Sequence, residues 1–185
     1  HNKDILNVQP HSDEAEQALL GCMLTSKDAV NIVYENRINS EHFYKSAHSL
    51  IFSAMNDLNE KQEPIDTVSV VDVLTKSKDL KNAGGAYYIS GLVELVPTTA
   101  HVQRYIKIVL EKSILRRLIY LANNISKEAY DDSKEIDQIL DSVDKAIFDI
   151  TSEKEKKNFI RLDTILVDSF DRIDKVSSNK GSIIG

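Results

Sequence analysis

Few side chains in this sequence have the spacing that catalysis or metal binding requires. No two of the internal histidines stand four residues apart, the step that places two ligands on one face of a helix, and Cys22 is not close to them in sequence. We therefore predict no metal site, and no pattern of Ser, His and Asp indicates an oxyanion site for nucleophilic catalysis. The internal histidines are His11, His42, His48 and His101.

Acidic residues between positions 131 and 149 form the other candidate cluster, because paired carboxylates can bind divalent cations. They alternate along a helical pattern without a nearby histidine, and only Lys134 and Lys145 oppose them, which is typical of a solvated helix face. We expect this face to provide solubility and partner choice. The acidic residues are Asp131, Asp132, Glu135, Asp137, Asp141, Asp144 and Asp149.

The glycines do not form a nucleotide-binding loop. No arrangement of Gly21, Gly84, Gly85, Gly91, Gly181 and Gly185 gives the phosphate cradle G-x-x-x-x-G-K-[ST]. We therefore expect these 185 residues to use no cofactor and to have no ATPase activity.

Charge argues against a surface built for nucleic acid. The net charge is -6, whereas phosphate backbones call for an excess of Lys and Arg. The best basic group contains Arg116 and Arg117, with Lys107 and Lys112 nearby. Arg116 or Arg117 could contact phosphate or pair with acids of a neighbouring hairpin, and we favour the pairing between helices.

The elements that position these residues are predicted to be helices, so the fold class is all-α. Ser12 is a suitable N-cap, and Asp13, Glu14 and Glu16 place negative charge on the first turn. We expect Glu14 and Glu16 to stabilise the helix end and make surface contacts. Cys22 falls on the apolar face of this helix and is predicted to be a small buried side chain.

Further helical stripes follow over 28–37, 43–58 and 86–96. His48 lies beside one of these stripes and is interpreted as a packing residue. The β-branched run from residue 67 to 73 would suit a strand, but Asp66 as N-cap and the apolar spacing favour a helix. Together these helices predict a compact head over residues 1–98.

Two longer helices follow the head, over about 99–130 and from 136 onward, joined by a polar turn. They predict an αα-hairpin over residues 99–152. A hairpin that projects from a small head needs a partner for its apolar surface, and a second copy would supply one through a two-fold dimer. The interface candidates are Leu115, Leu118, Ile136, Ile139, Leu140, Val143 and Ile147.

The end of the sequence is predicted to contain a flexible charged linker over 153–161 and a separate amphipathic linker helix over 162–178, with 179–185 leading onward. The helix has no core of its own and must dock on another surface. No apolar run approaches the length of a membrane span, and the lone cysteine fits a reducing compartment, so we expect a soluble cytoplasmic protein. The docking candidates are Leu162, Ile165, Leu166, Phe170 and Ile173.

The order of several short motifs resembles the N-terminal part of the bacterial replicative DNA helicase family, DnaB. The resemblance covers residues 8–185, and its last part is similar to the linker helix that precedes the family's ATPase domain. The motifs are Pro10-His11-Ser12, Glu14-Ala15-Glu16-Gln17, Phe43-Tyr44, His48 with Ile51-Phe52, Pro64-Ile65-Asp66, Gly84-Gly85 with Tyr88-Ile89, Pro97-Thr98 and Leu115-Arg116-Arg117-Leu118.

The resemblance implies a scaffolding collar without the motor. Hairpins would pair into dimers, three dimers would close a hexameric ring, and the C-terminal domain of primase would dock at Tyr88, Ile119 and Ile125. These three residues could instead belong simply to the core. A helicase loader is a further implied partner, while ATP, Mg and DNA would be bound by the parent's motor domain.

Two other functions are alternatives to this interpretation. One is a dimeric helical regulator that binds nucleic acid, which would need a basic recognition helix. The other is an enzyme with an unrecognised site, which the absence of a clustered catalytic pattern disfavours.

Overall fold

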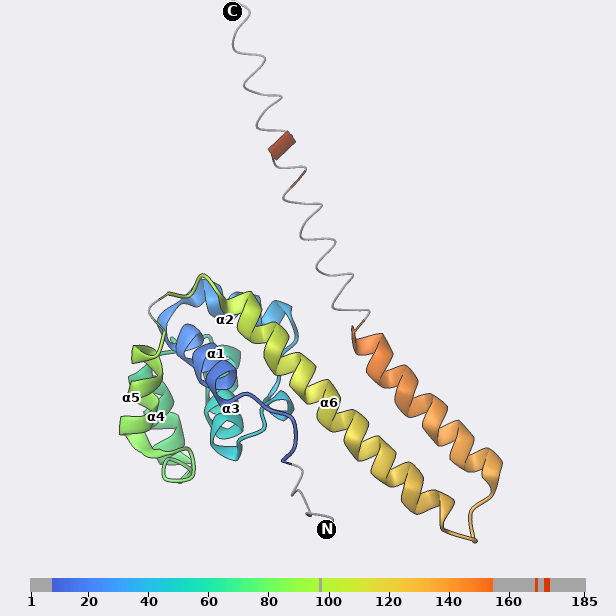
Figure 1. The fold of residues 1–185 in the computed structure, drawn as a ribbon. Coiled ribbons are helices and arrows are strands. Elements are labelled where there is room, and N and C mark those ends of the chain that lie inside the picture. Colours follow the sequence, from blue (N-terminus) through green and yellow to red (C-terminus); the bar gives the residue numbers. More distant parts are fainter. Residues whose placement is uncertain (1–7, 97, 155–168, 170–171, 174–185) are drawn as a thin grey trace, which may run out of the picture. The chain divides into compact units, whose positions relative to one another are not determined.

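The computed structural model describes residues 8–96, 98–154, 169 and 172–173, and the secondary structure in these residues is entirely helical (Figure 1). This confirms the predicted all-α fold class. The helices are α1 (Asp13–Thr25), α2 (Lys27–Glu35), the short 3-10 helix η1 (Ser40–His42), α3 (Ser46–Glu60), α4 (Thr67–Lys76), α5 (Gly85–Glu94) and α6 (Val102–Ala129), and a further helix covers 136–154.

Local side-chain caps explain where several helices begin. The Ser12 hydroxyl accepts a hydrogen bond from the Ala15 N–H at 3.2 Å. Asp66 caps α4 in the same way, with its Oδ1 2.8 Å from the N–H of Ser69. Each cap satisfies a backbone donor that the first turn leaves without a partner. The structure thus confirms the helix at 67–76 and excludes the alternative strand.

The chain divides into two compact units, residues His1–Ala122 (unit 1) and Asn123–Gly185 (unit 2). In unit 1, α1 packs against α2, α3 and α5, and α4 packs against α3 and α5. Val102, Ile106 and Val109 of α6 join the same hydrophobic core, so the compact unit continues past residue 98, where the head was predicted to end. These three residues follow one another at steps of four and three, so they form one apolar face at the start of α6, and this face packs on the core.

The crossing of α1 and α5 depends on a glycine. A Cβ atom added to Gly21 would lie 2.3 Å from the carbonyl oxygen of Leu92 and 2.8 Å from Cγ2 of Val96. Only a residue without a side chain allows the two backbones to come this close. Cys22, the next residue, is buried as predicted, and burial raises the pKa of its thiol to about 11.

Unit 2 contains the end of α6, a turn at 130–135 and the helix over 136–154. Glu128 accepts a hydrogen bond from Lys134 Nζ at 2.9 Å and another from Ser142 Oγ at 3.3 Å, so it joins the turn and the second helix. The residues 155–168, and with them Leu162, Ile165 and Leu166 of the predicted linker helix, lie outside the described residues, as does Phe170. Ile173 is described and is exposed.

No described helix combines the length and the apolar character that crossing a bilayer demands.

Candidate functional site

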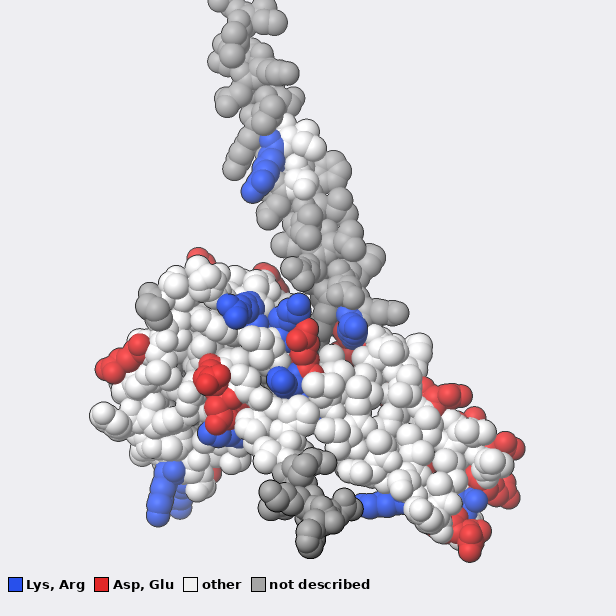
Figure 2. Space-filling view, viewed as in Figure 1, with Lys and Arg blue, Asp and Glu red and all other residues white. Residues whose placement is uncertain are grey.

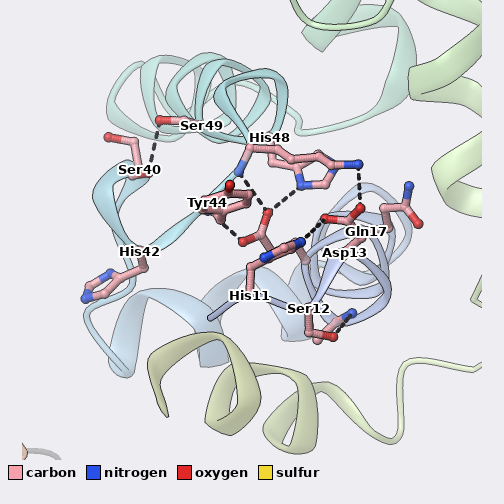
Figure 3. Close-up of polar contacts among 12 residues, drawn as sticks. His11, Ser12, Asp13, Gln17, Ser40, His42, Tyr44, His48 and Ser49 are labelled. Carbon is pink, nitrogen blue, oxygen red and sulfur yellow. Dashed lines mark hydrogen bonds and ion pairs between the residues drawn. The ribbon is translucent and has the colours of Figure 1, made fainter. Parts of the chain in front are cut away.

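A buried polar network joins three helices of unit 1. The side chain of Glu16 on α1 is only 2% exposed and that of His48 on α3 is fully buried, with His48 Nδ1 2.5 Å from Glu16 Oε2. The same carboxyl group accepts the backbone N–H of Tyr44 at 2.6 Å and that of Lys45 at 3.4 Å. Figure 3 shows His48 reaching from α3 toward the helix that carries Asp13 and Gln17.

The network ends at Tyr88 on α5. Its hydroxyl oxygen lies 2.7 Å from His48 Nε2 and accepts a hydrogen bond from the Gln17 side-chain amide at 3.0 Å. A carboxylate can only accept, so His48 Nδ1 carries a hydrogen, and in the neutral ring Nε2 is then the acceptor for the Tyr88 hydroxyl. Every buried polar group of the network therefore has a partner, which is the condition under which such groups stabilise a fold.

Tyr88 is half-buried and its ring packs against the core. The ring is parallel to that of His48, with an interplanar angle of 6°, and it lies directly over Gly84, where an added Cβ would be 2.6 Å from Tyr88 Cδ1. Gly84 has a φ of 97°, a conformation that favours glycine. The neighbouring Tyr87, in contrast, is 94% exposed.

The other two primase-docking candidates lie elsewhere. Ile119 is exposed on α6 and is not among the residues that pack on the core, whereas Tyr88 is. Tyr88 is on α5 and Ile119 is on α6, and these two helices do not pack extensively against each other. Ile125 is half-buried and belongs to unit 2. The docking role of all three residues stays a prediction.

Arg116 binds backbone carbonyl groups of two other segments of unit 1. It donates from Nη1 to the carbonyl oxygen of Pro10 at 2.9 Å and from Nη2 to that of His42 at 2.7 Å. Its guanidinium also lies over the ring of Tyr44, which stacks on His11. Burial lowers the pKa of Arg116, although a guanidinium stays charged at neutral pH. Arg116 thus connects α6 by a hydrogen bond to the segment before α1. The pairing of Arg116 or Arg117 with acids of a neighbouring hairpin stays a prediction.

The exposed interface candidates of the predicted hairpin belong to two apolar strips, one on each helix. On 136–154, Ile139 and Val143 are half-buried, whereas the flanking Ile136, Leu140 and Ile147 are exposed. Residues three and four apart share a face, so these three form one continuous strip, named here the 136–147 strip. On α6, Leu115, Leu118 and Ile119 form a second exposed strip, the α6 strip. An involvement of either strip in dimerisation stays a prediction.

The acidic residues between 131 and 149 are all exposed, as a solvated face requires. Figure 2 shows acidic side chains gathered around the end of the helix pair in unit 2. Among the residues that the structure describes, no group of three or more His, Cys, Asp or Glu side chains could hold a metal ion. The Asp131 pKa is lowered by hydrogen bonds from the Ser133 side chain and backbone, which involve no metal.

Glu16 is the residue that sequence reasoning placed wrongly. It was expected to make surface contacts at the start of α1, yet it is buried and forms the centre of the polar network. A signal was available, because Glu16 stands three, four and seven residues before Leu19, Leu20 and Met23 and therefore shares their buried face. The expectation that His48 is a hydrogen-bonded packing residue is confirmed.

These features define an all-helical domain organised around a buried polar network, with apolar strips left on its surface. The family model described as the DnaB-like helicase N terminal domain matches residues 8–111. The chain belongs to this family. It also resembles a solved structure, the N-terminal domain of DnaB helicase from Mycobacterium tuberculosis, with a TM-score of 0.72 and 35% identity, covering 77% of this chain and 99% of that one.

Full-length relatives are similar over nearly the whole chain. The replicative DNA helicase DnaB of Geobacillus stearothermophilus is 39% identical over 96% of this chain, and the replicative DNA helicase DnaC of Bacillus subtilis is 35% identical over 98%. The chain spans 39% and 40% of the length of these relatives. A structure described as a DnaB-like replicative helicase and its interactions with primase matches 77% of this chain and 31% of that one, with a TM-score of 0.64 and 27% identity.

Proposed function

We propose that this domain is a scaffold of a bacterial replicative helicase, which assembles the subunits into a hexameric ring and docks the C-terminal domain of primase. The observation that carries the assembly part is the 136–147 strip, whose three aliphatic side chains are exposed along one helix face. An exposed apolar strip is typical of a surface that another chain covers. A two-fold dimer would bury the strip of each of its two chains in one interface.

The docking part is supported by a relative. A solved DnaB-like helicase, to which this chain is 27% identical, is described together with its interactions with primase. In this chain Ile119 has an exposed aliphatic side chain, and Tyr88 has an aromatic ring that packs partly against the core. Such residues are frequent anchors of protein interfaces. The same proposal assigns contacts with a loader to this scaffold, places the protein in the cytoplasm, and leaves ATP, Mg and DNA to a motor domain.

Self-association is tested with Leu140→Glu, which places a charge in the middle of the 136–147 strip. Burying an unpaired carboxylate at an interface is strongly unfavourable, and a two-fold interface would contain the change twice. We expect the dissociation constant to rise by at least about 100-fold, which corresponds to roughly 2.8 kcal/mol. Light scattering after size-exclusion chromatography measures the mass at several concentrations.

Phe148→Glu is the matched control. Phe148 is on the same helix and is 68% exposed, but at 3.6 residues per turn its position lies about 80–120° around the helix from the three residues of the strip. We expect Phe148→Glu to leave the oligomeric mass unchanged. Equal dissociation by both variants would refute the assignment of the strip, and an unchanged chain that is monomeric at all concentrations would refute self-association.

A further inference from the structure

The side chain of Tyr88 is fixed from three sides. Its hydroxyl oxygen is 2.7 Å from His48 Nε2 on α3 and 3.0 Å from Gln17 Nε2 on α1, while its ring lies against the backbone of Gly84. Rotation about the first side-chain torsion, χ1, would carry the hydroxyl away from both partners and break both hydrogen bonds. Tyr87 belongs to the same helix but is 94% exposed, so it is the natural comparison for a tyrosine on α5 that the core does not restrain.

The residues that hold Tyr88 are themselves held. His48 can present Nε2 in one direction only, because its Nδ1 is bound to Glu16 at 2.5 Å. The carboxyl group of Glu16 is in turn fixed by the N–H groups of Tyr44 and Lys45 at the start of α3. Lys45 also forms an ion pair with Asp13, with Nζ and Oδ2 2.5 Å apart. A continuous chain of contacts therefore runs from α1 through α3 to the ring on α5.

We propose that Glu16, Gln17 and His48 are positioning residues, which hold the Tyr88 ring in one orientation so that a protein partner meets it already ordered. This inference rests on the proposed docking of primase at Tyr88. A tyrosine that is free before binding loses its rotational freedom on binding, whereas a ring held beforehand does not. The network contributes to affinity without touching the partner.

Two substitutions of His48 separate positioning from stability. His48→Asn keeps an amide near the former Nδ1 and can still donate to Glu16, but it cannot reach Tyr88. His48→Gln is longer by one methylene, so its amide can donate to the Tyr88 hydroxyl near the former Nε2 position. Both variants lose one of the two hydrogen bonds of a buried side chain, so we expect their melting temperatures to fall by similar amounts.

Binding of the primase C-terminal domain is measured by calorimetry for the 185-residue chain and its variants. We expect Tyr88→Phe and His48→Asn to bind about 3- to 10-fold more weakly, the cost of ordering one side chain. His48→Gln is expected to stay within about twofold of the unchanged chain, and Tyr87→Phe, the matched control, to bind without change.

A second readout does not depend on primase. NMR of the chain with ¹³C-labelled tyrosine reports the χ1 rotamers through three-bond couplings. We expect one χ1 rotamer for Tyr88 in the unchanged chain and in His48→Gln, but averaging over several rotamers in His48→Asn. The inference is overturned if Tyr88→Ala loses binding while His48→Asn does not, or if both His48 variants lose affinity equally. If Tyr88→Ala binds like the unchanged chain, the proposed docking at Tyr88 fails and the inference fails with it.

Discussion

Adding a single methyl group at Gly21 should loosen the centre of unit 1. The new Cβ would lie 2.3 Å from a backbone carbonyl oxygen of α5, so α1 and α5 must separate by about 1 Å to restore ordinary contact. A gap of this size forfeits about a quarter to a half of the dispersion energy across the contact. Overpacking of a core costs about 1–3 kcal/mol, whereas replacing a helical glycine by alanine gains about 0.5–1 kcal/mol.

From the midpoints of these two ranges, we expect Gly21→Ala to lower the free energy of unfolding by about 1 kcal/mol, which lowers the melting temperature by about 2–4 °C in a chain of this size. Gly91→Ala is the matched control, because Gly91 is also helical and a Cβ there meets no atom within 4 Å. It should raise the melting temperature by about 2–4 °C through helix propensity. Circular dichroism measures both, and a Gly21→Ala variant that melts at or above Gly91→Ala would refute the reasoning.

Three further predictions concern local groups. Asp66→Ala removes the cap of α4 and should lower the free energy of unfolding by about 1 kcal/mol, measured as a lower melting temperature, whereas Asp66→Asn should lower it less. Burial and the charge of Glu60 raise the pKa of Tyr34 to about 12, so its contribution to stability is complete below pH 10 and is lost as the pH rises through 12. In urea unfolding, the free energy of unfolding should fall less between pH 8 and 11 for Tyr34→Phe than for the unchanged chain. An equal fall in both proteins would contradict this prediction. Because burial raises the pKa of Cys22 to about 11, native maleimide labelling at pH 8 should be at least about a hundredfold slower than in the unfolded chain, and rapid native labelling would disprove it.

The helix starts could be predicted because their causes are local. Ser12 and Asp66 accept hydrogen bonds from N–H groups three residues later, so the spacing in sequence is the spacing in space. The all-α class followed in the same way from apolar residues at helical steps. The choice of helix over strand for 67–76 also depended on the Asp66 cap.

The polar network could not be predicted in this way, because its partners are distant in sequence. Glu16 and His48 are 32 residues apart, and His48 and Tyr88 are 40 apart. The charge of Glu16 favoured a surface position, and only the tertiary contacts of His48 and two backbone N–H groups stabilise its burial. Arg116 is a similar case, since the carbonyl oxygen that it binds belongs to Pro10, 106 residues earlier.

The mass of the complex with primase tests the scaffolding proposal most directly. The 185-residue chain is mixed with the C-terminal domain of primase and separated by size-exclusion chromatography, and light scattering gives the mass of each peak. We predict that the chain alone forms a dimer or a larger even-numbered assembly, and that the peak gains the mass of bound primase domain. A monomeric chain that elutes separately from the primase domain at every concentration would contradict the proposal.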